Sequence, residues 1–166
     1  MFQIGDKIVY GSEGVFFVSE YTTSPIDKAD QRVFYILRPV GSAENNMIVT
    51  PGEGCSVKVR PVMSRDEALS LIDRIGEIEE VKVEFERGRR DAYRAVLCRG
   101  MGEDFVSLIK TVRRRRAEFL AQKRRLSETD TDFESRARHC LFTELAVALD
   151  ITRSEAESLV AQKMAE

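Results

Sequence analysis

The hydrophobic pattern changes its period once, at Ser64, and this change limits the possible folds more than any other feature of the chain. Before Ser64, runs rich in Val, Ile, Phe and Tyr alternate with short segments of Gly, Pro, Asn and Ser, which is typical of strands and turns. After Ser64, apolar residues recur at helical spacing. We therefore predict an α+β chain in which strands and helices occupy separate regions.

The first sixty residues contain five candidate strands joined by short turns. Pro39, Pro51 and Pro61 fall near strand ends, where a missing amide hydrogen does least harm. This pattern predicts a small antiparallel, barrel-like module or a strongly bent sheet over residues 1–62. The candidate strands are "DKIVY", "GVFFVSEYT", "RVFYILRPV", "NMIVT" and "CSVKVRPV".

Capping boxes predict where three of the following helices begin, because a hydroxyl and a carboxylate three residues later satisfy free backbone amides. Apolar stripes predict further helices from Arg89 onward. We expect a helix and a linker over residues 63–86, with the helix at 64–76, and a C-terminal α-helical bundle over residues 87–166. The three boxes are Ser64 with Glu67, Thr131 with Glu134, and Thr152 with Glu155.

Positive charge is concentrated in the middle of the chain. Residues 82–126 hold 14 Lys and Arg against 6 Asp and Glu, although the whole chain has a net charge of -2. A basic region between two acidic flanks suits a nucleic acid. The alternative is a solvated helix face that contacts no partner.

Two basic clusters are candidates for DNA contact. The first lies at a predicted helix start, where backbone amides add hydrogen-bond donors, and we expect it to contact DNA more than the second. In the second, "KTVRRRRAEFLAQKRRLS", consecutive arginines cannot share one helix face, and Arg116 must pair with an acid or extend past the core. The candidates are Arg87, Arg89, Arg90 and Arg94 in the first cluster, and Arg113, Arg114, Lys123 and Arg124 in the second.

The sequence offers no assembled catalytic or metal site. His139 is the only histidine and has no evident acid–base partner. The cysteines, Cys55, Cys98 and Cys140, are more than forty residues apart, so we expect small buried side chains and no disulfide framework. We expect a cytoplasmic protein that is not an enzyme and has no cofactor, metal, membrane or small-molecule substrate.

Three segments together resemble the CarD-type transcription regulators. "FQIGDKIVYGSEGVFFV" is similar to the opening of that family, "RRDAYRAVL" with "FVSLIKTVRR" to its first C-terminal helices, and "LSETDTDFESRARHCLFTELAVAL" with "EAESLV" to its closing helices. The opening alone also fits the matching module of transcription-repair coupling factors. The helical half favours the stand-alone regulators.

The resemblance implies a Tudor-like N-terminal module that binds the β subunit of bacterial RNA polymerase. It also implies a helical domain that binds promoter DNA at the upstream edge of the transcription bubble and modulates the stability of the open complex. We expect the polymerase contact to use a strand edge, in which Ser24 and Val49 occupy positions where some relatives carry arginines. The expected polymerase-binding residues are Ser24, Ile26, Met47, Ile48 and Val49.

The chain departs from the family at an aromatic position. Family members usually carry a tryptophan that wedges against DNA, and this chain has no tryptophan. Phe85 is the one aromatic residue in residues 82–90. It is either the wedge or a residue that packs the linker against the helices, because "VKVEF" alternates like a short strand.

Two other functions stay open at this point. The chain could be a DNA- or RNA-binding module that acts without polymerase, or a protein–protein adaptor whose basic helices dock on an acidic partner. Both alternatives share the basic region, but neither needs an exposed strand edge.

Overall fold

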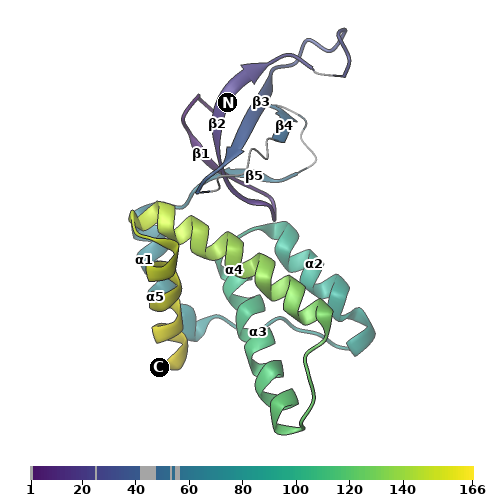
Figure 1. Ribbon diagram of the computed structural model, residues 1–166, viewed down its shortest axis with the longest axis vertical. Coiled ribbons are helices and arrows are strands. Elements are labelled where there is room, and N and C mark those ends of the chain that lie inside the picture. The colour runs from purple at the N-terminus through teal and green to yellow at the C-terminus, as the bar shows by residue number, and fades with distance from the viewer. Residues whose placement is uncertain (1, 25, 42–47, 53, 55–56) are drawn as a thin grey trace.

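The computed structural model describes residues 2–24, 26–41, 48–52, 54 and 57–166 of the chain. Within these residues, an N-terminal antiparallel sheet of five strands is followed by five α-helices. The sheet stands at one end of the molecule and the helices form the other (Figure 1). The α+β prediction and the order of its two parts are therefore confirmed.

The five described strands form an open sheet in the order β4-β3-β2-β1-β5. The predicted barrel-like closure is absent from this part of the chain, because the edge strands β4 and β5 lie at opposite sides of the sheet. Pro39, Pro51 and Pro61 each end a strand, as predicted. The strands are β1 (Lys7–Tyr10), β2 (Gly14–Thr22), β3 (Phe34–Pro39), β4 (Ile48–Pro51) and β5 (Val59–Pro61).

Two of the three predicted capping boxes, at Ser64 and Thr152, begin a helix as predicted. The Ser64 hydroxyl accepts from the Glu67 amide (3.2 Å), and the Glu67 carboxylate accepts from the Ser64 amide (2.7 Å). The Thr152 box has the same geometry. The helices are α1 (Arg65–Asp73), α2 (Arg89–Arg99), α3 (Gly102–Ala121), α4 (Glu128–Leu149) and α5 (Arg153–Ala165).

The third predicted box, Thr131 with Glu134, is wrong. Helix α4 begins one turn earlier, where the Ser127 hydroxyl accepts from the Asp130 amide (3.1 Å). Asp130 is fully buried and pairs with residues of α2 and α3, so tertiary contacts select the earlier start. Glu134 instead pairs with Arg116 across the helix interface.

The main core lies among the helices. The apolar face of α3, including Phe105, Leu108 and Val112, is buried against the other helices. At helical spacing the sequence would extend this apolar stripe to Phe119 and Leu120, but Leu120 is 74% exposed. Figure 1 shows the reason: the last turns of α3 project from the end of the molecule opposite the sheet.

The linker between α1 and α2 is anchored along α3. It contains two short 3-10 turns, η1 (Ile75–Glu77) and η2 (Glu86–Gly88). The Lys110 ammonium donates to the Ile78 carbonyl (2.6 Å), and the Val81 amide donates to the Thr111 hydroxyl (2.8 Å). No strand forms over "VKVEF", so the strand suggested there by the alternation of apolar and polar residues is wrong.

The turn between β1 and β2 packs on α4. The Cys140 thiol donates to the Ser12 carbonyl (3.3 Å), and a Cβ atom added at Gly14 would lie 3.2 Å from the His139 ring. Cys140 is buried as expected, and burial raises the pKa of its thiol to about 12. Cys98 is exposed, contrary to expectation, because it lies on the outer face of α2. Cys55 lies outside the described residues.

Candidate nucleic-acid interface

The predicted cluster at the start of α2 divides into exposed and internal side chains. Arg87 and Arg90 are exposed and form no ion pair within the described residues. Arg94 is also exposed, with a guanidinium nitrogen 3.7 Å from the Asp91 carboxylate. An exposed pair at this distance contributes little to stability, so all three arginines are available to an anionic partner.

Arg89, in contrast, points into the helical module and is 13% exposed. Its Nε lies 3.1 Å from a carboxylate oxygen of Asp130, and its guanidinium also donates to the Ser127 hydroxyl (3.0 Å). Arg115 approaches the same Asp130 from α3 at 3.3 Å. The structure therefore places Arg89 between helices, in a position where it joins α2 to α4.

Arg89, Arg115, Asp130, Tyr93 and Glu86 form a connected group that we name the Asp130 cluster. The Tyr93 hydroxyl donates to Asp130 (3.0 Å), and burial together with the Asp130 charge raises the pKa of Tyr93. The hydrogen bond from Arg115 lowers the pKa of Glu86 (2.8 Å). Arg89 and Arg115 thus neutralise Glu86 and Asp130. We infer that these four charges hold the helices together rather than bind a partner.

The arginine run is also partly internal. Arg114 is bound by Glu80 (2.5 Å) and Glu118 (2.6 Å). Arg116 pairs with Glu134, which is the first of the two alternatives predicted for Arg116. Arg113 is exposed and has no ion pair within the described residues.

The turn between α3 and α4 carries further exposed basic side chains. Lys123 and Arg124 are exposed there. The Arg124 guanidinium stacks over the Phe119 ring, 4.6 Å from its centroid. A guanidinium that stacks on an aromatic ring keeps its charge, and the N–H groups at the edge of the guanidinium can still donate hydrogen bonds.

An ion pair and a hydrogen bond connect the elements that carry these exposed residues. Arg115 with Glu86, and Arg89 with Ser127, connect the start of α2, the second half of α3 and the start of α4. In Figure 1, α3 ends at the tip of the molecule opposite the sheet, and α2 and α4 each begin at the end of the helix that lies farther from the sheet. We name this region the distal basic surface; its residues are Arg87, Arg90, Arg94, Arg113, Lys123 and Arg124.

Phe85 lies beside this surface and is 64% exposed. The Arg87 guanidinium lies 5.8 Å from the centroid of its ring. The interpretation that Phe85 packs the linker is wrong: Val81 and Val83 pack against the helical core, whereas Phe85 turns outward at η2. An exposed aromatic ring beside a basic side chain is suited to contact with nucleic-acid bases.

The predicted polymerase-binding residues lie in two places. Ile48 and Val49 belong to β4, an edge strand of the described sheet. Ser24 and Ile26 lie in the loop after β2, where the Ser24 hydroxyl accepts from the Ile26 amide (3.4 Å) and Ile26 is 95% exposed. Met47 lies outside the described residues. Of the predicted polymerase-binding residues that the structure describes, only Ile48 and Val49 therefore lie on a strand edge.

The register of β4 shows which of its amides face outward. The Gly52 amide donates to the Val33 carbonyl (2.8 Å), in line with the register of the β3–β4 pair. Bonded and non-bonded residue pairs alternate in antiparallel strands, so the Ile48 amide faces β3 and the Val49 amide faces the open edge. Pro51, which has no amide hydrogen, occupies an outward position as well.

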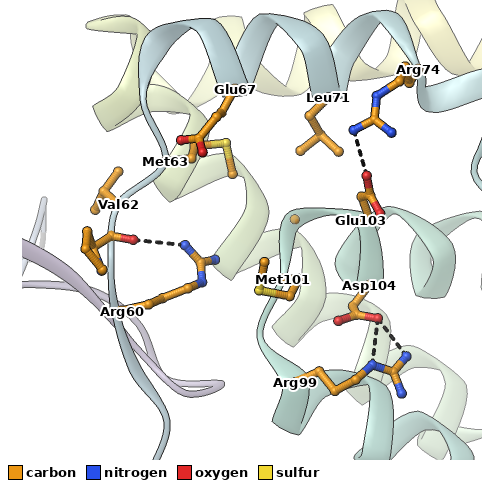
Figure 2. Close-up of a pocket in the computed structure, with 12 residues that line it drawn as sticks. Arg60, Val62, Met63, Glu67, Leu71, Arg74, Arg99, Met101, Glu103 and Asp104 are labelled. Atoms are coloured by element: carbon orange, nitrogen blue, oxygen red, sulfur yellow. Dashed lines mark hydrogen bonds and ion pairs between the residues drawn. The ribbon is translucent and has the colours of Figure 1, made fainter.

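A cavity of about 700 Å³ lies where β5, α1 and the start of α3 meet (Figure 2). Its wall is partly apolar, and two ion pairs stand at its rim. Because the paired arginines are already neutralised by acids of the same wall, the cavity favours no class of ligand. The apolar residues are Met63, Leu71 and Met101, and the pairs are Arg74 with Glu103 (2.7 Å) and Arg99 with Asp104 (2.6 Å).

Sequence reasoning missed the residues that hold the surface in place. Arg115, Asp130 and Glu86 were not singled out, nor was the contact between Arg60 of β5 and Glu144 of α4. One signal was available for Glu144, which is a lone acid in the apolar stretch "CLFTELAVAL". An isolated charge on a buried helix face indicates a partner from elsewhere in the chain.

Within the described residues, no group of three or more His, Cys, Asp or Glu side chains is placed to hold a metal ion. In the same residues, no helix combines the length and apolar character needed to cross a membrane. No protein-family model matches the chain, and no curated protein matches it significantly. The geometry of the exposed residues is therefore the basis on which a function is assigned.

Proposed function

We propose that the chain is a bacterial transcription regulator of the CarD type. Its N-terminal module, residues 1–62, binds the β subunit of RNA polymerase, and its helical module binds promoter DNA and modulates the stability of the open complex. In this proposal the sheet is Tudor-like in its connections, although open among the described strands. The protein acts by binding alone and performs no chemical step.

The observation that carries the proposal is the exposure of Phe85 beside the Arg87 guanidinium. Arg87 and Arg90 supply charge that attracts the phosphate backbone, and such contacts position a protein without reading sequence. An apolar ring at the same place can enter a groove and partly unstack a base step, which a phosphate contact cannot do. The combination suits DNA that is already distorted, as at the edge of a transcription bubble.

Polymerase binding is supported by the free edge of β4. An outward amide at Val49 allows a strand of the partner to add to the sheet through backbone hydrogen bonds. Backbone pairing tolerates side-chain change, so valine can replace the arginine that some relatives of the CarD type carry. Edge strands that are neither covered nor blocked are the usual sites of such addition.

The test uses the full chain, because the β1–β2 turn and Arg60 contact the helical module and the isolated sheet would expose them. We expect the protein to co-purify with the polymerase β subunit and to lengthen or shorten the lifetime of promoter open complexes. A chain that binds DNA but neither binds polymerase nor changes that lifetime would be a nucleic-acid-binding module acting alone. A chain that binds neither DNA nor polymerase would contradict the proposal altogether.

A further inference from the structure

A second basic site shares no residue with the distal basic surface. It is a depression of about 430 Å³ between the β1–β2 turn, the middle of α4 and the start of α5. Its lining is polar and includes two arginines, the single histidine and two serines. The lining residues are Ser12 and Glu13 of the turn, Ser135, Arg136 and His139 of α4, and Arg153 of α5.

The two arginines are held by weak or neutral contacts. Arg136 donates to the Ser12 hydroxyl (3.1 Å) and lies 3.9 Å from the Glu13 carboxylate, at the limit of an ion pair. Arg153 forms no ion pair within the described residues, and its Nη1 lies 3.5 Å from Nδ1 of His139. Both arginines are exposed and can move toward an anion in the depression.

The position of Arg153 is unfavourable for a cation. It is the first residue of α5, and the positive end of a helix dipole disfavours positive side chains there. It is not needed to cap the helix, because Thr152 and Glu155 already satisfy the amides. A bound anion would offset the Arg153 charge and the helix dipole together.

His139 is placed to respond to such an anion. A Cβ atom at Gly14 would lie 3.2 Å from His139 Nε2, so the glycine leaves room for the ring beside the turn. Burial and the Arg153 charge lower the pKa of His139, whereas Glu13 raises it. The charged groups that face the ring are therefore Arg153 of α5, Glu13 of the turn and Arg136 on its own helix.

We propose that this depression is a phosphate-binding site, formed by Arg136, Arg153 and His139 with the Ser12 and Ser135 hydroxyls. Planar guanidinium groups from two elements match the several oxygens of a phosphate better than the two of a carboxylate. The phosphate belongs either to a small phosphorylated molecule or to the DNA backbone. The site does not depend on polymerase binding and goes beyond the function proposed above.

The single histidine makes the site measurable by NMR. We expect inorganic phosphate to shift the His139 imidazole signals in a saturable way and to raise the His139 pKa, compared with chloride at the same ionic strength. Arg153→Ala should weaken phosphate binding by about tenfold, as expected for the loss of a charge-assisted hydrogen bond. Glu13→Gln should strengthen binding, because it removes the competing carboxylate.

Lys163→Ala is the matched control, since it removes one positive charge from the other end of α5. It should leave phosphate binding unchanged. Arg153→Ala should fold normally, because it relieves an unfavourable charge at a helix start. An equal response to phosphate and chloride, or a wild-type affinity for phosphate in Arg153→Ala, would overturn the proposal.

A DNA titration distinguishes the two sources of phosphate. If the ligand is the DNA backbone, Arg153→Ala should also lower DNA affinity and reduce the salt slope by about one unit. If the ligand is a small molecule, Arg153→Ala should bind DNA like the wild type while losing inorganic phosphate. Either result supports the site, and neither depends on whether polymerase is a partner.

Discussion

Arg60 of β5 and Glu144 of α4 form a bidentate ion pair across the junction between the sheet and the helices, with N–O distances of 2.5 and 2.8 Å. Glu144 is fully buried, and its carboxylate also accepts from the Met63 amide (3.0 Å). The Arg60 guanidinium donates as well to the Gly100 carbonyl at the end of α2 (2.6 Å). One arginine therefore fixes the sheet to two helices.

Removing Arg60 should destabilise the protein strongly. Arg60→Met keeps an apolar stem of similar length but leaves the Glu144 charge buried without its partner, which costs about 3–5 kcal/mol. Chemical denaturation of the full chain measures this loss. Arg32→Met is the matched control, because Arg32 pairs with Asp30 on an exposed surface and such pairs contribute little to stability. Equal losses in the two variants would show that the junction pair does not hold the modules together.

The distal basic surface should give DNA binding a steep salt dependence. Each phosphate neutralised contributes about -0.9 to the slope of log affinity against log salt. The double variant Arg87→Ala, Arg90→Ala should flatten that slope by about one to two units, with little change in sequence preference. Fluorescence anisotropy over a series of salt concentrations measures the slope.

Arg114→Ala serves as the control for this experiment. Arg114 belongs to the arginine run but is bound by Glu80 and Glu118, so its removal should change the slope less than the double variant does. If Arg114→Ala flattens the slope more, the internal pairs open on binding and DNA lies along α3 instead.

Along β4, the backbone amides point alternately toward β3 and toward the open edge, so proline at neighbouring positions should have different effects. Val49→Pro removes the outward amide and should abolish binding to the polymerase β subunit while leaving the β3–β4 hydrogen bonds in place. Ile48→Pro removes an amide that faces β3 and should lower the free energy of unfolding as well. Co-purification and thermal denaturation of both variants separate loss of binding from loss of the sheet. A folded Val49→Pro protein with wild-type affinity for polymerase would exclude β4 as the docking strand.

Local sequence signals predicted most of the fold. Strand ends at Pro39 and Pro61 and the helix start at Ser64 depend on neighbouring residues, so they could be located from the chain alone. Thr131 failed as a helix start because two cap patterns follow one another there, Ser127 with Asp130 and Thr131 with Glu134. The buried contacts of Asp130, which come from α2 and α3, decide between them.

The candidate site was predictable only in part. The sequence shows that residues 82–126 are basic, but not which arginines are internal. Arg89 and Arg90 are adjacent and chemically identical, yet one joins helices and the other is exposed. That difference depends on Asp130, about forty residues later in the chain, and no local pattern encodes it.

Phe85 provides the sharpest test of the proposed mechanism. Its ring is 64% exposed, so Phe85→Ala should change the free energy of unfolding by less than about 1 kcal/mol, the usual range for surface positions. If the ring is a wedge that unstacks a base step, the same variant should shorten the lifetime of promoter open complexes while polymerase binding is retained. Leu120→Ala is the matched control, because Leu120 is also an exposed apolar residue at this end of the molecule. Shortened lifetimes in Leu120→Ala and normal ones in Phe85→Ala would assign the wedge to the tip of α3, and normal lifetimes in both would leave the DNA contact purely electrostatic.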